Sequence, residues 1–140
     1  ILATQDAKKR GYDEAILLDK NGNVSEAPGE NIFIIKKNTL ITPPLSSSAL
    51  DGITRKSILK FSKDLNLKTK VKNISVKELK SADEVFLSGT AAEITPVIKL
   101  EKMKIGTGKI GPVTQVVMEK YSDIVMNSNK MYSKWITPVY

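Results

Sequence analysis

Two tight turns near the start of the chain constrain its fold more than any other feature. Asn21-Gly22, a residue pair favoured in two-residue hairpin loops, separates an expected buried strand at 14–19 from its expected partner strand at 24–26. Lys37-Asn38 separates two further apolar segments in the same way. Because such turns join antiparallel neighbours, we expect a hairpin-rich sheet in the first third of the chain.

Helices and strands alternate along the whole chain. The expected strands are 14–19, 24–26, 31–35, 39–42, 68–74 as a lysine-rich edge strand, 84–87, and 94–100 broken by Pro96. The expected helices are 2–10 ending at Gly11, 51–65 with Asp51 as its N-cap, 75–79 capped by Ser75, and 113–126 opened by Pro112. Hairpins combined with helical connections predict an α/β fold with a mixed sheet.

The residue types present limit the chemistry. The length of 140 residues suits one domain with a core of its own. The chain has no cysteine and no histidine, which excludes disulfides, cysteine nucleophiles, Ser-His-Asp catalysis and most zinc sites, so no metal is expected. Acid–base work would fall to lysine, tyrosine or carboxylates.

The formal net charge is +7, carried by scattered lysines and only two arginines. A basic anion-binding or nucleic-acid-binding module is therefore one alternative. Because the lysines do not alternate with aromatic residues, we favour a solvated lysine-rich surface and expect no nucleic-acid partner. No apolar run reaches the roughly 18 residues of a membrane span, and no signal-peptide pattern is seen, so we expect a cytoplasmic protein without membrane association.

Two turns have the composition of anion-binding sites. At Gly52-Ile53-Thr54, the start of a helix would leave backbone N–H groups free for a phosphate. At Ser88-Gly89-Thr90-Ala91, small residues after a strand would allow consecutive N–H groups to form a concave nest. No Gly-Lys-Ser/Thr sequence follows either turn, which disfavours a nucleoside-triphosphate site. Each turn alone is also compatible with an ordinary capped helix or strand end.

Glu26 and Glu30 flank Pro28-Gly29, and two carboxylates this close could act as an acid–base pair. Strand periodicity places Glu26 on the same, apolar, face as Val24. A carboxylate there needs a stabilising partner, which points to a site, although exposed glutamates at hairpin ends are also common.

These motifs together resemble the branched-chain amino acid aminotransferases, a group of fold type IV pyridoxal phosphate enzymes. The resemblance covers nearly the whole chain, in family order, and its most specific part is the last motif. The motifs are 11–15 (GYDEA), 25–33 (SEAPGENIF), 42–45 (TPPL), 50–55 (LDGITR), 82–86 (ADEVF) and 88–97 (SGTAAEITPV).

The resemblance implies a mixed, largely antiparallel sheet forming a pseudo-barrel with flanking helices, and pyridoxal 5′-phosphate as cofactor. It implies that Glu26 bonds the pyridine nitrogen and that Leu50 packs on the ring. Gly52, Ile53 and Thr54 would hold the phosphate at the helix start, and Thr90 would add a hydroxyl. The N–H groups of Thr90 and Ala91 would help to hold the substrate carboxylate. Tyr121 and Trp135 are expected to have packing roles only.

The resemblance also implies a missing part. The family's Schiff-base lysine and smaller N-terminal domain lie upstream of Ile1, so residues 1–140 are expected to be a truncated C-terminal cofactor-binding domain, inactive alone and without a catalytic residue of its own. The full-length protein is expected to transfer amino groups between leucine, isoleucine or valine and 2-oxoglutarate, as a homodimer or larger oligomer. A D-amino acid aminotransferase or an aminodeoxychorismate lyase of the same fold is the alternative.

Overall fold

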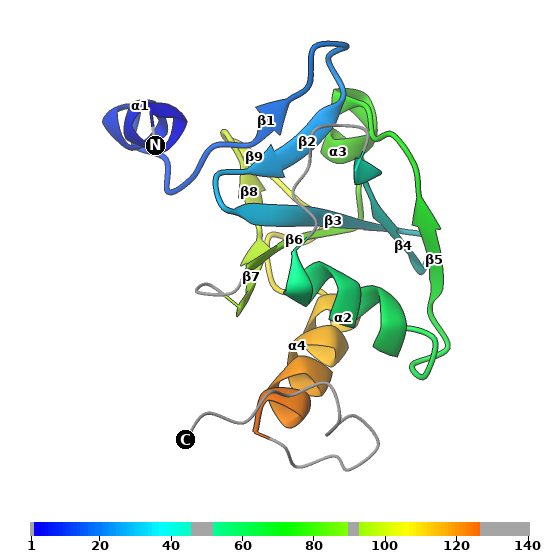
Figure 1. The fold of residues 1–140 in the computed structure, drawn as a ribbon. Helices are drawn as coiled ribbons and strands as arrows, with labels where there is room; N and C mark the ends of the chain where they lie inside the picture. Colours follow the sequence, from blue (N-terminus) through cyan, green and yellow to red (C-terminus); the bar gives the residue numbers. More distant parts are fainter. Residues whose placement is uncertain (1, 46–51, 90–92, 127–140) are drawn as a thin grey trace.

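The computed structural model describes residues 2–45, 52–89 and 93–126 (Figure 1). The helices are α1 (Leu2–Lys9), α2 (Ile53–Phe61), α3 (Val76–Lys80) and α4 (Pro112–Val125). The strands are β1 (Leu17–Leu18), β2 (Val24–Ala27), β3 (Glu30–Lys36), β4 (Thr39–Thr42), β5 (Lys68–Val71), β6 (Glu84–Gly89), β7 (Glu93–Val97), β8 (Lys99–Leu100) and β9 (Met103–Lys104). Among these residues, no helix is both long and apolar enough to cross a membrane.

Strand β3 is the centre of a seven-stranded sheet. It pairs antiparallel with β2 and β4 and, over its length from Asn31 to Ile35, with β6. Strand β7 continues the sheet beyond β6, and β5 runs parallel to β4 as an edge strand. The mixed, largely antiparallel sheet with flanking helices is thus confirmed, and within the described residues it stays open rather than closing on itself.

Both faces of β3 are buried, because helices cover the sheet on each side (Figure 1). Ile32 and Ile34 belong to an apolar cluster that includes Leu79 of α3. Phe33 and Ile35 alternate with them and pack with residues of α2 and α4, and the Phe33 ring stacks on Phe86 at a centroid distance of 4.9 Å. A one-residue slip in register would move each set of side chains to the opposite face and disrupt the packing of both clusters.

The first expected hairpin has a longer loop than the sequence suggested. Leu18 pairs with Val24, so residues 19–23 form the loop and β1 is reduced to Leu17–Leu18. The Asp19 carboxylate accepts hydrogen bonds from the N–H groups of Asn21 (2.8 Å) and Asn23 (3.0 Å), which stabilise a turn wider than two residues. The Lys37-Asn38 turn is confirmed, since both residues have positive φ and Lys36 pairs with Thr39.

Helix α2 is shorter than expected at both ends. Its N-cap is Gly52 rather than Asp51, which lies outside the described residues, and none of the described side chains caps it. It ends at Phe61, and the backbone then turns through Asn66, whose φ is 58°, instead of continuing to residue 65. Between these points the backbone forms i→i+3 turns instead of α-helix: the N–H of Leu65 donates to the Ser62 carbonyl and the N–H of Asn66 to the Lys63 carbonyl, both at 3.1 Å.

Three other expectations have clear outcomes. Ser75 caps α3 as predicted, through a reciprocal capping box with Glu78. Pro112 opens α4 at its first turn, also as predicted. Pro96 does not break its strand: it pairs with Phe86 inside β7, and the break comes at Ile98. Because β7 pairs only with β6 among the described strands, the missing N–H of proline can face away from the ladder.

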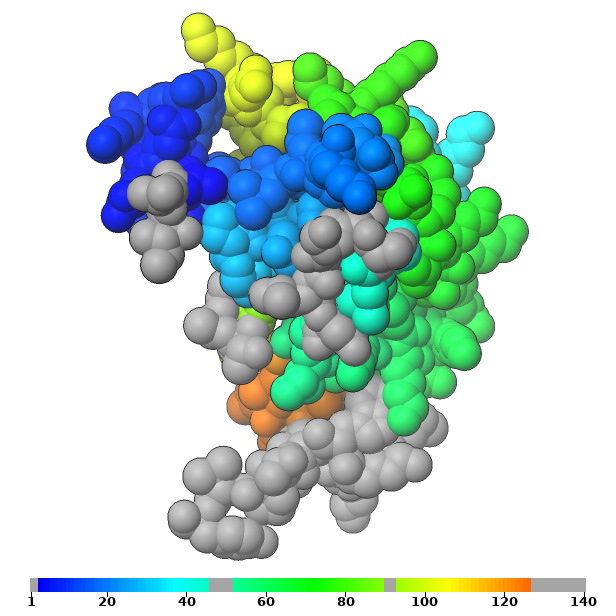
Figure 2. All heavy atoms as spheres, turned by 45° about the horizontal axis from the view of Figure 1, so that its top comes forward, coloured from blue at the N-terminus to red at the C-terminus, as the bar shows by residue number. Residues whose placement is uncertain are grey.

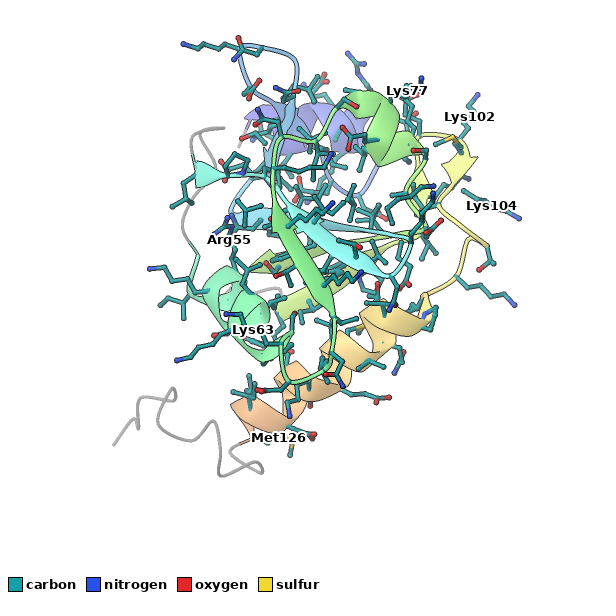
Figure 3. All side chains as sticks on the ribbon, turned by 90° about the vertical axis from the view of Figure 1, so that its right-hand side faces the viewer. Arg55, Lys63, Lys77, Lys102, Lys104 and Met126 are labelled. Carbon is teal, nitrogen blue, oxygen red and sulfur yellow. The ribbon has the colours of Figure 1, made fainter. Side chains whose placement is uncertain are left out.

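The lysines expected to be solvated extend from the surface (Figure 3). Lys63, Lys77, Lys102 and Lys104 are all exposed and point away from the sheet. The exposed lysines of β5, Lys68 and Lys70, lie along the free edge of the sheet, where charge opposes pairing with another strand.

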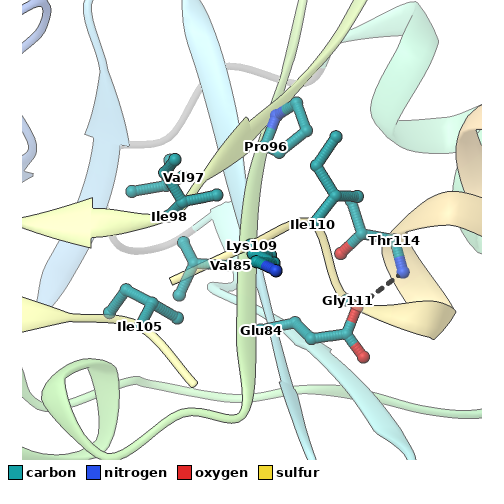
Figure 4. Close-up of a pocket in the computed structure, with 10 residues that line it drawn as sticks. All are labelled: Glu84, Val85, Pro96, Val97, Ile98, Ile105, Lys109, Ile110, Gly111 and Thr114. Atoms are coloured by element: carbon teal, nitrogen blue, oxygen red, sulfur yellow. Dashed lines mark hydrogen bonds between the residues drawn. The ribbon is translucent and has the colours of Figure 1, made fainter. Parts of the chain in front are cut away.

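The start of α4 is held by a carboxylate from the sheet (Figure 4). Glu84 of β6 accepts hydrogen bonds from the N–H groups of Thr114 (2.7 Å) and Val113 (3.2 Å). Gly111 leaves room for this carboxylate, because a Cβ atom there would lie 2.1 Å from Glu84 Cδ. The adjoining cavity, about 10 Å³, has room for no more than about one water molecule.

We predict that Glu84→Ala destabilises the protein by about 1–2 kcal/mol, because α4 loses both acceptors at its N-terminus. Glu84→Gln, which keeps one acceptor oxygen, should cost less. The control is Glu119→Ala on the exposed side of α4, expected to change the free energy of unfolding by less than about 0.5 kcal/mol. Urea unfolding measures all three, and equal effects of Glu84→Ala and Glu119→Ala would contradict this role.

Candidate active site

One end of the sheet carries a row of polar residues across three strands. Glu26 of β2 lies opposite Asn31 of β3, and Asn31 lies opposite Ser88 of β6. Residues directly opposite in antiparallel strands project from the same face. Asn31 is two residues from Phe33 and therefore lies on the same face of β3, so the row continues the face that α2 and α4 cover.

The start of α2 lies against this row. A Cβ atom at Gly52 would be 2.5 Å from Asn31 Oδ1, so any larger residue at this position would require the Asn31 side chain to move. The first turn of α2 has no side-chain cap among the described residues, and its leading N–H groups have no acceptor within the helix. The positive end of the helix dipole therefore lies next to the polar row, an arrangement suited to an anion.

Three consecutive residues of α2 have different surroundings. Ile53 is 76% exposed, whereas Thr54 and Arg55 are buried. The Thr54 hydroxyl lies 3.4 Å from the Tyr121 hydroxyl of α4. The guanidinium of Arg55 donates a hydrogen bond to the Pro43 carbonyl at 3.1 Å, which ties α2 to the segment that follows β4.

The structure brings together part of the predicted site. Glu26, Gly52, Ile53 and Thr54 lie at one end of one face of the sheet, through the row and its contact with α2. Leu50, Thr90 and Ala91 lie outside the described residues, so their predicted roles are untested.

The predicted orientation of β2 was wrong in one respect. Val24 packs in the α3-side cluster together with Ala27, although Glu26 faces the opposite side beside Asn31. The register shifts between β1 and β2, where Ser25 is an extra residue, and this irregularity reverses the alternation. Glu26 therefore faces the α2 side of the sheet because of this extra residue, which strict two-residue periodicity does not predict.

Sequence reasoning did not single out Asn31, and it placed Ser88 in an anion-binding turn, whereas Ser88 lies inside β6. Ser88 is fully buried, and among the described residues its hydroxyl has no hydrogen-bond partner. Asn31 is 5% exposed. The sequence signal that could have identified them is a polar residue near the end of an otherwise apolar strand: Asn31 in β3 and Ser88 in β6. These two residues lie opposite each other in the sheet.

Glu26 and Glu30 do not form the acid–base pair that their spacing suggested. Glu30 lies opposite Ala27 and so projects from the other face. Burial raises the pKa of the Glu30 carboxyl, and the nearby Glu14 carboxylate raises it further. Glu14 in turn accepts a hydrogen bond from the Thr4 hydroxyl of α1 at 2.8 Å.

Helix α1 lies at one edge of the molecule, beside the loop that joins β2 to β3 (Figure 2). Thr4 and Gln5 of α1 and Pro28 and Gly29 of this loop line an open hollow of about 480 Å³. The hollow therefore borders the turn that immediately precedes Glu30.

We predict that Glu30→Gln stabilises the protein increasingly as pH rises. A raised pKa favours the protonated carboxyl in the folded state, so its ionisation destabilises the fold as pH rises through the folded pKa. The melting temperature of the variant minus that of the parent protein should be near zero at about pH 4 and positive at about pH 8. A difference that does not grow with pH, or that matches exposed Glu119→Gln, would contradict this assignment.

Comparisons with known proteins show the family to which the chain belongs. The sequence profile described as amino-transferase class IV matches residues 1–100. A probable branched-chain-amino-acid aminotransferase of Aquifex aeolicus is 48% identical over 140 residues, which cover 99% of this chain and 45% of that protein.

Two solved structures share the fold. The branched-chain aminotransferase of Thermoproteus uzoniensis with norvaline has a TM-score of 0.94 and 45% identity, over 99% of this chain and 46% of that one. A second branched-chain amino acid aminotransferase, from T.th. and complexed with N-(5′-phosphopyridoxyl)-L-glutamate, has a TM-score of 0.95 and 40% identity, over 99% and 47%. The chain spans somewhat under half the length of these relatives. Because the family profile matches residues 1–100, the chain belongs to the amino-transferase class IV family.

Proposed function

We propose that residues 1–140 are the cofactor-binding C-terminal domain of a longer branched-chain amino acid aminotransferase that uses pyridoxal 5′-phosphate. The observation that carries the proposal is the close approach of Gly52 to Asn31. It sets the start of α2, which none of the described side chains caps, beside the row that contains Glu26. A helix N-terminus and a carboxylate on one sheet face are the two groups that a phosphorylated pyridine needs.

The residues present fit this cofactor. Its phosphate is an anion, for which the N–H groups of Ile53 and Thr54 and the Thr54 hydroxyl are suitable donors. Its ring nitrogen can carry a proton, for which the Glu26 carboxylate is a suitable acceptor. Gly52 leaves no side chain between these two groups. Leu50 against the ring, and Thr90 and Ala91 toward phosphate and substrate carboxylate, complete the proposed set.

When bound, pyridoxal phosphate supplies an electron sink for the charge that develops at the substrate Cα. Glu26 would keep the ring nitrogen protonated and so increase the ring's capacity for that charge. The start of α2 would fix the phosphate, and therefore the ring, at one distance from Glu26. Rigid positioning of this kind comes from β3, which is buried on both faces.

The proposed reaction exchanges amino groups between leucine, isoleucine or valine and 2-oxoglutarate. Norvaline in the Thermoproteus uzoniensis structure and the phosphopyridoxyl-glutamate in the second structure support an aliphatic amino acid and glutamate as the two substrates. We further propose that the remainder of the full-length protein supplies the Schiff-base lysine and a small domain, that the protein is a cytoplasmic homo-oligomer, and that residues 1–140 alone are inactive.

The substrate assignment is tested on the full-length protein with pyridoxal phosphate. L-leucine, L-isoleucine and L-valine should each yield glutamate from 2-oxoglutarate, while D-alanine should not. Release of pyruvate from aminodeoxychorismate measures the lyase alternative. Activity confined to D-alanine or to aminodeoxychorismate would refute the proposed substrate class while keeping the family.

We predict that Glu26→Gln in the full-length protein weakens pyridoxal phosphate binding on the order of 10- to 100-fold. Glutamine has nearly the same shape but removes a charge-assisted hydrogen bond worth about 1.5–3 kcal/mol. The dissociation constant is obtained by titrating the apoprotein and following cofactor absorbance. Glu119→Gln, exposed on α4, is the control. Equal affinities for the two variants would show that Glu26 does not contribute to cofactor binding.

A further inference from the structure

We propose that Tyr121 is a positioning residue that orients the Thr54 hydroxyl toward the cofactor phosphate. This inference rests on the proposed function, since it assigns a role at the same phosphate site. The two hydroxyl oxygens are 3.4 Å apart, and they join the first turn of α2 to the third turn of α4. The sequence alone had suggested a packing role for Tyr121.

The ring and the hydroxyl of Tyr121 have separate surroundings. The ring packs against the apolar cluster of α2, α4 and the sheet, which includes Phe33, Phe61 and Val117. A phenylalanine ring would fill the same space. The hydroxyl adds the contact with Thr54, a residue that is 4% exposed. Removal of this one oxygen therefore separates positioning from packing.

The direction of the hydrogen bond decides whether Thr54 can serve an anion. A hydroxyl has one proton to donate and two lone pairs that accept. The Tyr121 hydroxyl can donate its proton to Thr54 Oγ1. Thr54 then keeps its own proton for a phosphate oxygen, while its position is fixed from the α4 side. A phosphate that draws the Thr54 proton makes Oγ1 a better acceptor, so the two hydrogen bonds strengthen each other.

The length of the contact is consistent with a role in the bound state. At 3.4 Å, the contact is longer than the usual separation of about 2.7–2.8 Å in a hydroxyl pair. Such contacts in ligand-free sites often shorten when the ligand completes the network. We therefore expect a small contribution of the Tyr121 hydroxyl to folding and a larger one to cofactor binding.

A double-mutant cycle in the full-length protein tests this inference. The variants are Tyr121→Phe, Thr54→Val and the double variant, and Thr54→Ser is included because it restores the hydroxyl. Tyr12→Phe, at an exposed tyrosine after α1, is the matched control. Dissociation constants are measured for pyridoxal phosphate and for pyridoxal, which lacks the phosphate. Thermal unfolding of each apoprotein identifies any variant that fails to fold.

We expect Tyr121→Phe to weaken pyridoxal phosphate binding about 3- to 10-fold, in line with the loss of one hydrogen bond. The same substitution should have no further effect in the Thr54→Val background and none on pyridoxal affinity. Thr54→Ser should retain the sensitivity to Tyr121→Phe. Tyr12→Phe should change neither affinity.

The possible failures are distinguishable. Unchanged affinity in Tyr121→Phe, or an equal loss with pyridoxal or in the Thr54→Val background, would show that Tyr121 has only a packing role while the phosphate site stands. Unchanged affinity in Thr54→Val would overturn both this inference and the phosphate-binding role assigned to Thr54 in the proposed function. A Tyr121→Phe apoprotein that melts well below the parent would place the hydroxyl in the folding of α4 and overturn the inference.

Discussion

The close approach of Gly52 to the Asn31 side chain is the constraint on which the rest of the site depends. With Asn31 in its observed position, there is no room for a Cβ atom at Gly52, and the start of α2 can lie directly against the sheet. Because helix geometry then determines the direction of the first N–H groups, this one contact aims the positive end of α2 at the polar row. Asn31 also lies beside Glu26, so an anion-binding element and a carboxylate share one fixed frame.

The polar row of Glu26, Asn31 and Ser88 is held rigidly because its strands continue directly into the apolar core. Asn31 and Phe33 belong to the same face of β3, and Phe33 stacks on Phe86, two residues before Ser88. The other end of β6 performs a comparable task, since Glu84 holds the start of α4. Helices α4 and α2, which carry Tyr121 and Thr54, are therefore both held against β6 and its neighbours. This fixes the relative position of the two hydroxyls.

Local features of this fold could be predicted from sequence, and features set by distant contacts could not. The Lys37-Asn38 turn, the Ser75 cap and the Pro112 helix start depend on neighbouring residues and were predicted correctly. The Asp19 carboxylate widened the first turn, and an extra residue at Ser25 reversed the face of Glu26. Glu26 and Glu30 did not pair because the turn between β2 and β3 puts Ala27, not Glu26, opposite Glu30. The composition of the Gly52–Thr54 turn predicted an anion site, and the family resemblance assigned roles to Glu26 and Thr54. Asn31 became visible only when the register placed it beside Glu26 and the start of α2 approached its side chain.

The central claim is that the start of α2 and the Glu26 carboxylate hold the two ends of one cofactor. A crystal structure of the full-length protein with pyridoxal phosphate tests this directly. We predict a phosphate hydrogen-bonded to the N–H groups of Ile53 and Thr54, with the ring nitrogen at about 2.7–2.9 Å from a Glu26 oxygen. A phosphate bound away from α2, or a ring nitrogen facing a group other than Glu26, would contradict the account.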